Sequence, residues 1–218
     1  MSGAAAALAA GAAVAALARF VTADADMGLL LRGGHRRAAF EGKVVWITGA
    51  SQGLGQALAA YLASQGARLI LSSRSLEKLQ RAKEACAGGR AAAPEIVLLP
   101  LDVEGPQAAL EAAAKEADAA FGSAGVDFLV HNAGASQHAL AAETSREVAE
   151  KLLSLNALGP IALTRAALPQ MLARRRGRVV VVASMAARVP TPGQAVYSAA
   201  KAAQWGYFSS LATEVADQ

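Results

Sequence analysis

The sequence predicts an α/β fold, a doubly wound parallel sheet of about five strands with helices on both faces. Two observations predict it. Short apolar, β-branched runs alternate along the chain with longer helical stretches. The first of these runs ends in a glycine-rich turn that leads directly into a helical stretch. The 218 residues are 54% hydrophobic and 17% charged, which allows a sizeable buried core and excludes a disordered or fibrous chain.

Each element has its own local signal. Strands are expected where apolar runs are bounded by turn residues, at 43–49, 68–72, 95–101, 126–130 and 178–184. Helices are expected where helix formers follow a starting signal, at 54–65, 76–87, 106–121, 144 to about 174, and 194–215. A capping-box pair, Thr144 and Glu147, predicts the start of the fourth helix, and Gly159-Pro160 predicts a bend inside it.

The N-terminal 42 residues differ in composition from the rest. Residues 2–18 are uncharged and mostly alanine. They fit a membrane anchor, an Ala-rich disordered or helical leader, or a cleaved signal peptide. The stretch is shorter than the ~20 residues of a spanning helix, and no basic segment precedes it, as a signal peptide requires. A basic cluster at 32–37 follows, and in an anchored chain it favours a cytoplasmic domain. We expect 1–42 to be a leader or anchor with a basic linker.

The charge of the chain limits its partners only weakly. The formal net charge is +4, which favours anionic ligands without indicating nucleic acid. A basic cluster contains Arg174, Arg175, Arg176 and Arg178. We expect it to be a solvated helix end, where cations suit the helix dipole, and the alternative is a nucleic-acid site.

Cysteine and histidine usage gives no sign of a disulfide or a metal. Cys86 is the single cysteine, so no intrachain disulfide can form. His35, His131 and His138 have no metal-ligand spacing with cysteines or acids. We therefore expect no metal site.

The glycine turn spans Thr48 to Gly55, between the first strand and the first helix. Glycines allow a tight turn and a close approach of the backbone to a pyrophosphate, and the helix N-terminus adds free N–H groups and a positive dipole end. This context predicts that residues 43–218 form a Rossmann-type dinucleotide-binding domain. The residues expected to bind the cofactor here are Gly49, Ser51, Gln52, Gly53, Leu54 and Gly55.

The end of the second strand indicates which dinucleotide is bound. An acid there would bind a ribose 2′-hydroxyl, whereas a basic residue would meet a 2′-phosphate. The sequence has Ser72-Ser73-Arg74-Ser75 and no acid. Arg74 can pair with a phosphate, so NADP(H) is favoured over NAD(H). The alternative is that Arg74 is a solvated residue at a strand end.

Four residues form a candidate reactive set. Tyr197 and Lys201 lie four residues apart on the last helix, and therefore on one face. A phenol with a pKa near ~10 is a poor proton shuttle at neutral pH, unless a nearby ammonium favours its anion. Ser184 ends the fifth strand and Asn156 lies inside the long helix. Each residue alone is more often structural.

Four motifs and two single residues occur in one characteristic order: Thr48 to Gly55, Leu101 to Val103, His131 to Gly134, Asn156, Ser184, and Tyr197 to Lys201. In this order the chain resembles the short-chain dehydrogenase/reductase family from about Lys43 to Gln218. One departure occurs, because the family often has two asparagines where this chain has His131-Asn132.

The resemblance implies roles for these residues. Tyr197 would be the general acid in carbonyl reduction and the base in alcohol oxidation. Ser184 would hydrogen-bond the carbonyl oxygen, Lys201 would bind the nicotinamide ribose and favour the Tyr197 anion, and Asn156 would position a water in a proton relay. The remaining cofactor contacts implied are Asp102, Val103, Asn132, Ala133 and Gly134.

The resemblance also implies an activity and a setting. The chain would be an NADP(H)-dependent oxidoreductase that interconverts a carbonyl and an alcohol, on a lipophilic substrate such as a steroid or retinoid. It would pair as a homodimer through the helix at 194–201 and reside at the endoplasmic reticulum membrane, the alternative being the cytoplasm. Family members continue past the last helix, so we expect a domain incomplete at its C-terminus. The alternative function is a weakly active or inactive nucleotide-binding chain that acts as a dimer partner.

Overall fold

A single sheet of five parallel strands organises the chain, in the order β3-β2-β1-β4-β5. The computed structural model describes residues 11, 39–87, 95–189 and 191–217. The strands are β1 (Val44–Thr48), β2 (Arg68–Ser72), β3 (Ile96–Leu98), β4 (Phe128–His131) and β5 (Arg178–Val181). The chain builds the sheet outward from β1 to β3, and then crosses to the other side of β1 with β4. The strand order thus reverses between β1 and β4, and the predicted doubly wound parallel fold is confirmed.

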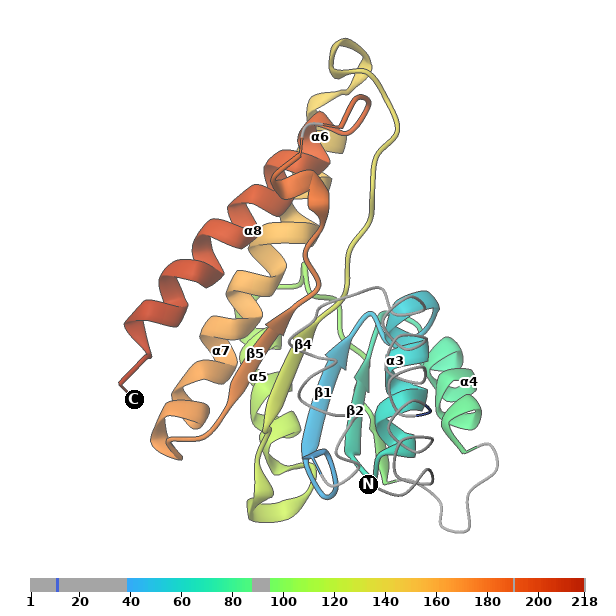
Figure 1. Cartoon of the computed structure of the whole chain (residues 1–218), viewed down its shortest axis with the longest axis vertical. Coiled ribbons are helices and arrows are strands. Elements are labelled where there is room, and N and C mark those ends of the chain that lie inside the picture. The colour runs from blue at the N-terminus through green and yellow to red at the C-terminus, as the bar shows by residue number, and fades with distance from the viewer. Residues whose placement is uncertain (1–10, 12–38, 88–94, 190, 218) are drawn as a thin grey trace, which may run out of the picture. The chain divides into compact units, whose positions relative to one another are not determined.

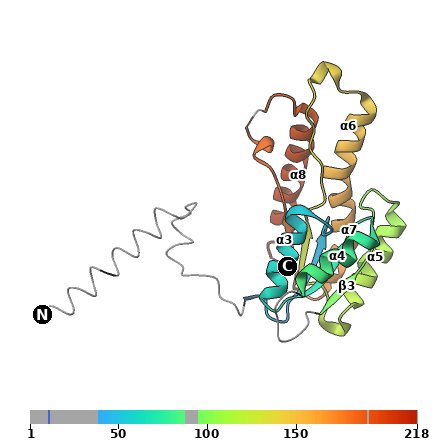
Figure 2. The ribbon, with the colours of Figure 1, turned by 90° about the vertical axis from the view of Figure 1, so that its right-hand side faces the viewer.

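Helices cover both faces of this sheet (Figures 1 and 2). The α-helices are α3 (Gly53–Ser64), α4 (Leu76–Cys86), α5 (Gln107–Ala119), α6 (Arg146–Leu153), α7 (Gly159–Ala173) and α8 (Ala195–Glu214). Val45 and Ile47 of β1 pack with α3 and α4, whereas Val44 and Trp46 face the core formed with α5 and α7. All five residues of β1 are buried, because a parallel strand between two helical layers has no solvent face.

Helix α8 lies alongside α7, with its N-terminal end next to α6 (Figure 1). It also packs against a 3₁₀ turn, η5 (Met185–Ala187), that follows β5. This packing brings the start of α8 to the carboxyl end of the sheet.

The start of the fourth predicted helix is not where the capping-box pattern placed it. The N-cap of helix α6 is Ser145, whose Oγ accepts a hydrogen bond from the Val148 N–H at 3.4 Å. Thr144 instead donates its hydroxyl to Leu140 O at 3.0 Å and accepts from Gln137. The prediction of Thr144 as the cap was wrong, because the hydroxyl of Thr144 is occupied by the turn before the helix.

The long helix predicted from 144 to 174 is interrupted. A π turn, η4 (Ser154–Leu158), separates α6 from α7. Pro160, the second residue of α7, directly follows this turn and has no N–H to donate back into it. A side chain at Gly159 would come within 2.7 Å of Val103 O. The irregularity expected near Gly159-Pro160 is therefore a widened turn just before them.

Strands β3 and β5 are shorter than the sequence indicated. The segments that follow them, 99–101 and 182–184, leave the sheet and form part of its carboxyl edge. The first keeps backbone hydrogen bonds to β2 and to Ser73, and the second keeps one from Val182 N to His131 O at 2.9 Å. Both segments thus keep hydrogen bonds to the neighbouring strand or its end before they become loops at the cleft described below.

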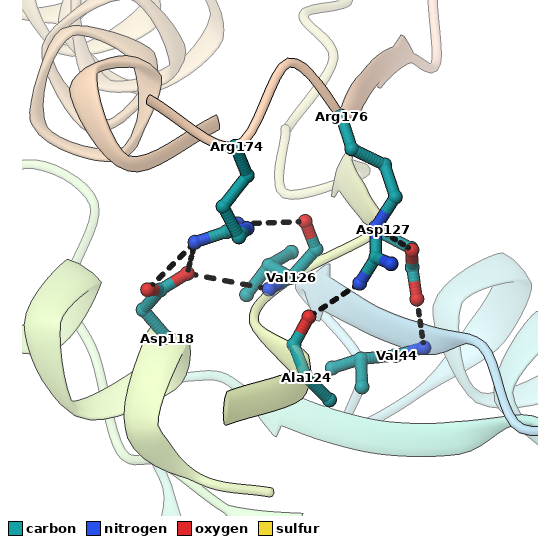
Figure 3. A network of polar contacts seen from close by, with 7 residues as sticks. All are labelled: Val44, Asp118, Ala124, Val126, Asp127, Arg174 and Arg176. Carbon is teal, nitrogen blue, oxygen red and sulfur yellow. Dashed lines mark hydrogen bonds and ion pairs between the residues drawn. The ribbon is translucent and has the colours of Figure 1, made fainter. Parts of the chain in front are cut away.

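Two of the four clustered arginines make ion pairs with acids before or in other elements. The guanidinium of Arg174 donates to both carboxylate oxygens of Asp118, at 2.7 and 2.8 Å, and to Val126 O at 3.3 Å (Figure 3). Arg176 pairs with Asp127 at 3.0 Å. The expectation of a solvated cluster is corrected for Arg174, which ties the end of α7 to α5, whereas Arg176 stays half exposed while it pairs with Asp127 before β4.

The membrane-anchor prediction concerns residues 2–18, which, apart from Gly11, lie outside the described residues. Within the residues that the structure does describe, no helix has the length and apolar character needed to cross a bilayer.

Candidate active site

An open cleft of about 500 Å³ lies at the carboxyl end of the sheet. Its walls come from the β1–α3 turn, the segments after β2, β3, β4 and β5, the π turn and the start of α8. Ligands of open α/β sheets bind outside the carboxyl ends of the strands, where the strand order reverses. The predicted cofactor residues that line the cleft are Gly49, Ser51, Gln52, Gly53, Leu54, Arg74, Asp102, Val103, Asn132, Ala133, Gly134, Tyr197 and Lys201.

Gly55, also predicted to bind the cofactor, lies behind the cleft wall. A Cβ on Gly55 would lie 2.3 Å from Gly49 O and 2.5 Å from Asn132 Nδ2. Gly49 has φ +64°, and a Cβ there would come within 2.8 Å of Ala133 Cα. These two glycines let α3 and the end of β4 close against the turn. The N-cap Gln52 makes no side-chain cap, so the first N–H groups of α3 face the cleft as an anion site.

Thr48 joins the two central strands at the cleft, a role that sequence reasoning missed. Its Oγ1 donates to Val130 O at 3.3 Å and accepts from the N–H groups of Asn132 and Ala133, at 3.1 and 3.2 Å. Asn132 Nδ2 in turn donates to Thr48 O and Gly49 O, both at 3.1 Å. The crossed bonds fix the glycine turn to the segment after β4.

The end of β2 is basic. Arg74 and Lys78 both line the cleft, and neither side chain has a hydrogen-bond or ion-pair partner among the described residues. Lys78 was missed by sequence reasoning, although its place in the first turn of α4, after the N-cap Ser75, was a usable signal. Asp102 is the one acid among the described residues lining the cleft, and its Oδ1 accepts from Glu104 N at 3.1 Å. An anionic group fits beside Arg74 and Lys78.

Asn156 lies in the π turn and is fully buried. Its Oδ1 accepts from Ala135 N at 3.2 Å, and its Nδ2 donates to Ala135 O and Leu152 O, both at 3.0 Å. The bond to Leu152 satisfies a backbone carbonyl beside the widened turn. Asn156 thereby holds the backbone after β4 against the helix, and it lines the cleft beside Gly134.

Lys201 is 5% exposed and is held at its ammonium end. The Nζ donates to Val182 O at 2.8 Å and to Gln204 Oε1 at 3.2 Å, and it lies 5.9 Å from the centroid of the Tyr197 ring. Burial lowers the pKa of Lys201, because desolvation disfavours the ammonium. Tyr197 and Lys201 thus share one wall of the cleft, as their spacing on the helix predicted.

Ser184 is placed differently from the other three reactive candidates. It caps η5, with its Oγ accepting from Ala186 N at 3.2 Å, and it does not line the cleft within the described part of the chain. A hydroxyl that accepts one hydrogen bond still has its proton to donate. The structure therefore brings Asn156, Tyr197 and Lys201 together and leaves Ser184 beside the cleft.

His131 is a buried residue next to this site. Its Nε2 lies 2.6 Å from Thr164 Oγ1 on α7, and its ring centroid lies 5.5 Å from that of Phe208 on α8. Burial, and secondarily the charge of Lys201, lowers the pKa of His131 to about 3. The imidazole is therefore neutral at physiological pH.

No metal-binding group was found among the described residues, where no three histidine, cysteine, aspartate or glutamate side chains are arranged to hold an ion. The site instead combines a glycine turn, a basic pair and a tyrosine–lysine pair, as in nicotinamide-dependent oxidoreductases. The family model for short chain dehydrogenases matches residues 43–218, and the chain belongs to this family.

Known relatives agree with this assignment. The chain is 40% identical over 204 residues to human dehydrogenase/reductase SDR family member 7, covering 92% of this chain and 59% of that protein. The mouse protein of the same name is 39% identical, covering 91% and 59%. The predicted resemblance to the family is confirmed, and within the family the chain is similar to member 7. This chain spans about three-fifths of the length of these relatives.

Two solved structures show the same fold. A metagenomic short-chain oxidoreductase in complex with NADP is 33% identical with a TM-score of 0.72, covering 81% of this chain and 77% of that one. A short-chain dehydrogenase from Streptomyces avermitilis is 35% identical with a TM-score of 0.71, covering 82% and 62%. The chain therefore shares the fold of the short-chain dehydrogenase family with both of these structures.

Proposed function

We propose that the protein is an NADP(H)-dependent oxidoreductase that interconverts a carbonyl and an alcohol. The observation that carries this proposal is the position of Tyr197 and Lys201 on a wall of the cleft that the glycine turn also lines. A bound nicotinamide supplies or accepts the hydride. The protein supplies binding, orientation and proton transfer around it.

Proton transfer is assigned to Tyr197. In reduction its hydroxyl donates a proton to the substrate oxygen, and in oxidation its phenolate accepts one. The ammonium of Lys201, held by Val182 O at 2.8 Å, stabilises the phenolate electrostatically. The hydroxyl of Ser184 donates a hydrogen bond to the substrate oxygen. Asn156 fixes the cleft wall at Ala135 through two backbone bonds.

The preference for NADP(H) rests on charge at the end of β2. Arg74 and Lys78 are free cations among the described residues and line the same part of the cleft. A 2′-phosphate placed there gains charge-assisted hydrogen bonds. A ribose 2′-hydroxyl finds no acid after β2, where the sequence is Ser72-Ser73-Arg74-Ser75.

The substrate we propose is a lipophilic carbonyl or alcohol, such as a steroid or retinoid. Met185, which follows Ser184 directly, is 78% exposed, and Leu140 in the loop after β4 is 60% exposed. Exposed apolar side chains in the segments that follow β4 and β5 favour an apolar ligand. Anchoring through residues 2–18 at the endoplasmic reticulum membrane and pairing of two copies through α8 are further parts of this proposal.

The experiment that tests the proposal is NADPH oxidation with a panel of lipophilic ketones and aldehydes. We expect Tyr197→Phe to lower kcat by at least ~100-fold while leaving NADPH binding unchanged, because only the acidic proton is lost. Tyr61→Phe on α3 is the matched control and should keep wild-type turnover. Retained activity in Tyr197→Phe would remove the tyrosine from the acid role. NADPH binding by the wild type without turnover would favour the inactive nucleotide-binding alternative.

A further inference from the structure

Two buried polar atoms near Lys201 have no hydrogen-bond partner within the described part of the chain. They are Gln204 Nε2 and His131 Nδ1, and both residues are only 1% exposed. Gln204 is bonded to the Lys201 ammonium. Phe208 follows Gln204 by four residues on the same face of α8 and packs on the His131 ring. The unpaired atoms therefore belong to one buried region between α8 and β4.

The orientation of the Gln204 amide is determined by its partner. An ammonium group has only donors, so the amide must present its oxygen to Lys201, and Oε1 lies 3.2 Å from Nζ. This orientation leaves Nε2 as a buried donor without an acceptor. A buried donor left unpaired lowers the stability of the fold, so an acceptor is expected for it.

His131 offers an acceptor of the right kind. A neutral imidazole has one N–H and one bare nitrogen. If Nε2 carries the proton and donates to Thr164 Oγ1 at 2.6 Å, then Nδ1 is a bare acceptor. The other tautomer would leave two buried donors, on His131 and Gln204, with no acceptor between them. The nearby charge of Lys201 also favours a lone pair over an N–H at Nδ1.

We propose that Thr164, His131, Gln204 and Lys201 form one polar chain inside the domain. It is closed by a hydrogen-bonded link between Gln204 Nε2 and His131 Nδ1, direct or through a single buried water. The link holds the Gln204 amide, and the amide holds the Lys201 ammonium toward the cleft. Gln204 and His131 are thus positioning residues, and their effect on turnover rests on the proposed function.

The pKa of Lys201 can be measured directly to test this proposal. The titratable groups facing it are Tyr197 from its own helix and His131 from β4. Lys201 can be followed by NMR of ¹³C-labelled lysine in the 218-residue protein, without any turnover. Gln204→Leu removes an acceptor from the ammonium and should lower the pKa of Lys201 further, whereas Gln204→Glu should raise it. A merely structural role would not move the pKa in opposite directions.

The link itself is tested by a double-mutant cycle. His131→Phe keeps packing against Phe208 but removes the acceptor for Gln204, so it should lower the Lys201 pKa in the same direction as Gln204→Leu. In the His131→Phe background, Gln204→Leu should then have a smaller effect than in the wild type. Gln170→Leu, a half-buried glutamine on α7, is the matched control and should leave the Lys201 pKa unchanged.

Catalytic activity gives a second test of the proposed polar chain of hydrogen bonds. With an active carbonyl substrate, Gln204→Leu should lower kcat/KM about tenfold, since a hydrogen bond to a charged group is worth roughly that factor. Equal Lys201 pKa values in the wild type and both Gln204 variants, or additive effects of Gln204 and His131, would overturn the proposal. A wild type that reduces no carbonyl would overturn the proposed function alone, because the NMR titration still measures the link.

Discussion

Loss of the Arg174 guanidinium should destabilise the fold without touching the cleft. Arg174 donates three hydrogen bonds, two to Asp118 and one to Val126 O, and the two charged side chains are 23% and 26% exposed. Arg174→Ala leaves Asp118 with the Val126 N–H at 3.3 Å as its described partner. Figure 3 shows that these contacts join α5, α7 and the start of β4.

The expected cost lies between two limits. Exposed ion pairs contribute up to ~1 kcal/mol, and breaking a fully buried pair costs roughly 3–5 kcal/mol. The pair is about one-quarter exposed. Arg174 Nε is buried and has no partner among the described residues, which lowers the net gain. We expect Arg174→Ala to lower the unfolding free energy by about 2 kcal/mol. For a domain of this size that corresponds to a drop in Tm of about 4–8 °C.

Thermal and urea unfolding followed by circular dichroism measure this change. Arg175→Ala is the control, since the side chain of Arg175 is exposed and has no partner among the described residues. It should change the unfolding free energy by less than about 0.5 kcal/mol. The reasoning would be refuted if the Arg174 and Arg175 variants unfolded at the same urea concentration. Asp118→Asn should reproduce most of the Arg174 effect and add little to it, because both remove one interaction.

Two further predictions concern charge. Replacing Arg74 and Lys78 together by alanine should weaken NADPH binding roughly tenfold to a hundredfold while leaving NADH binding almost unchanged. Fluorescence titration measures the affinity for both cofactors, with Arg81→Ala on α4 as the control. Equal losses of affinity for NADPH and NADH would contradict the cofactor preference. The pKa of His131 is lowered to about 3, so the unfolded chain binds a proton that the folded chain excludes, and stability should be lost as the pH falls from about 6.5 toward 3. Urea midpoints between pH 7 and 4 measure this loss, and a His131→Phe variant with the same pH dependence as the wild type would contradict it.

The fold was predictable because its signals are local. The β-branched runs, the helix formers and the glycine turn each identify an element within about a dozen residues. Tyr197 and Lys201 were placed on one wall because a helix fixes the geometry of residues four apart. The cofactor residues predicted in the glycine turn followed from the same strand–turn–helix pattern, whereas Asp102, Val103 and 132–134 were predicted from the family resemblance.

The misses have a different origin, since each depends on contacts that the local pattern does not contain. Thr144 and Ser145 can both cap a helix through a side-chain hydroxyl. Ser145 is the cap because the Thr144 hydroxyl is hydrogen-bonded to Gln137 and to Leu140 O. Arg174 resembled a solvated cation until α5 brought Asp118 beside it.

The π turn at Ser154–Leu158 sets the rotation of α7 about the helix axis relative to α6. One residue added to a regular helix rotates everything after it by about 100°, and a wide turn absorbs one such residue. Leu163 and Thr164 are fully buried on α7, and Thr164 contacts His131. A one-residue deletion inside the turn would rotate this buried face of α7 by about 100°. An exposed position of the turn such as Leu158 should therefore accept substitution, whereas the length of the turn and its buried Asn156 should not change.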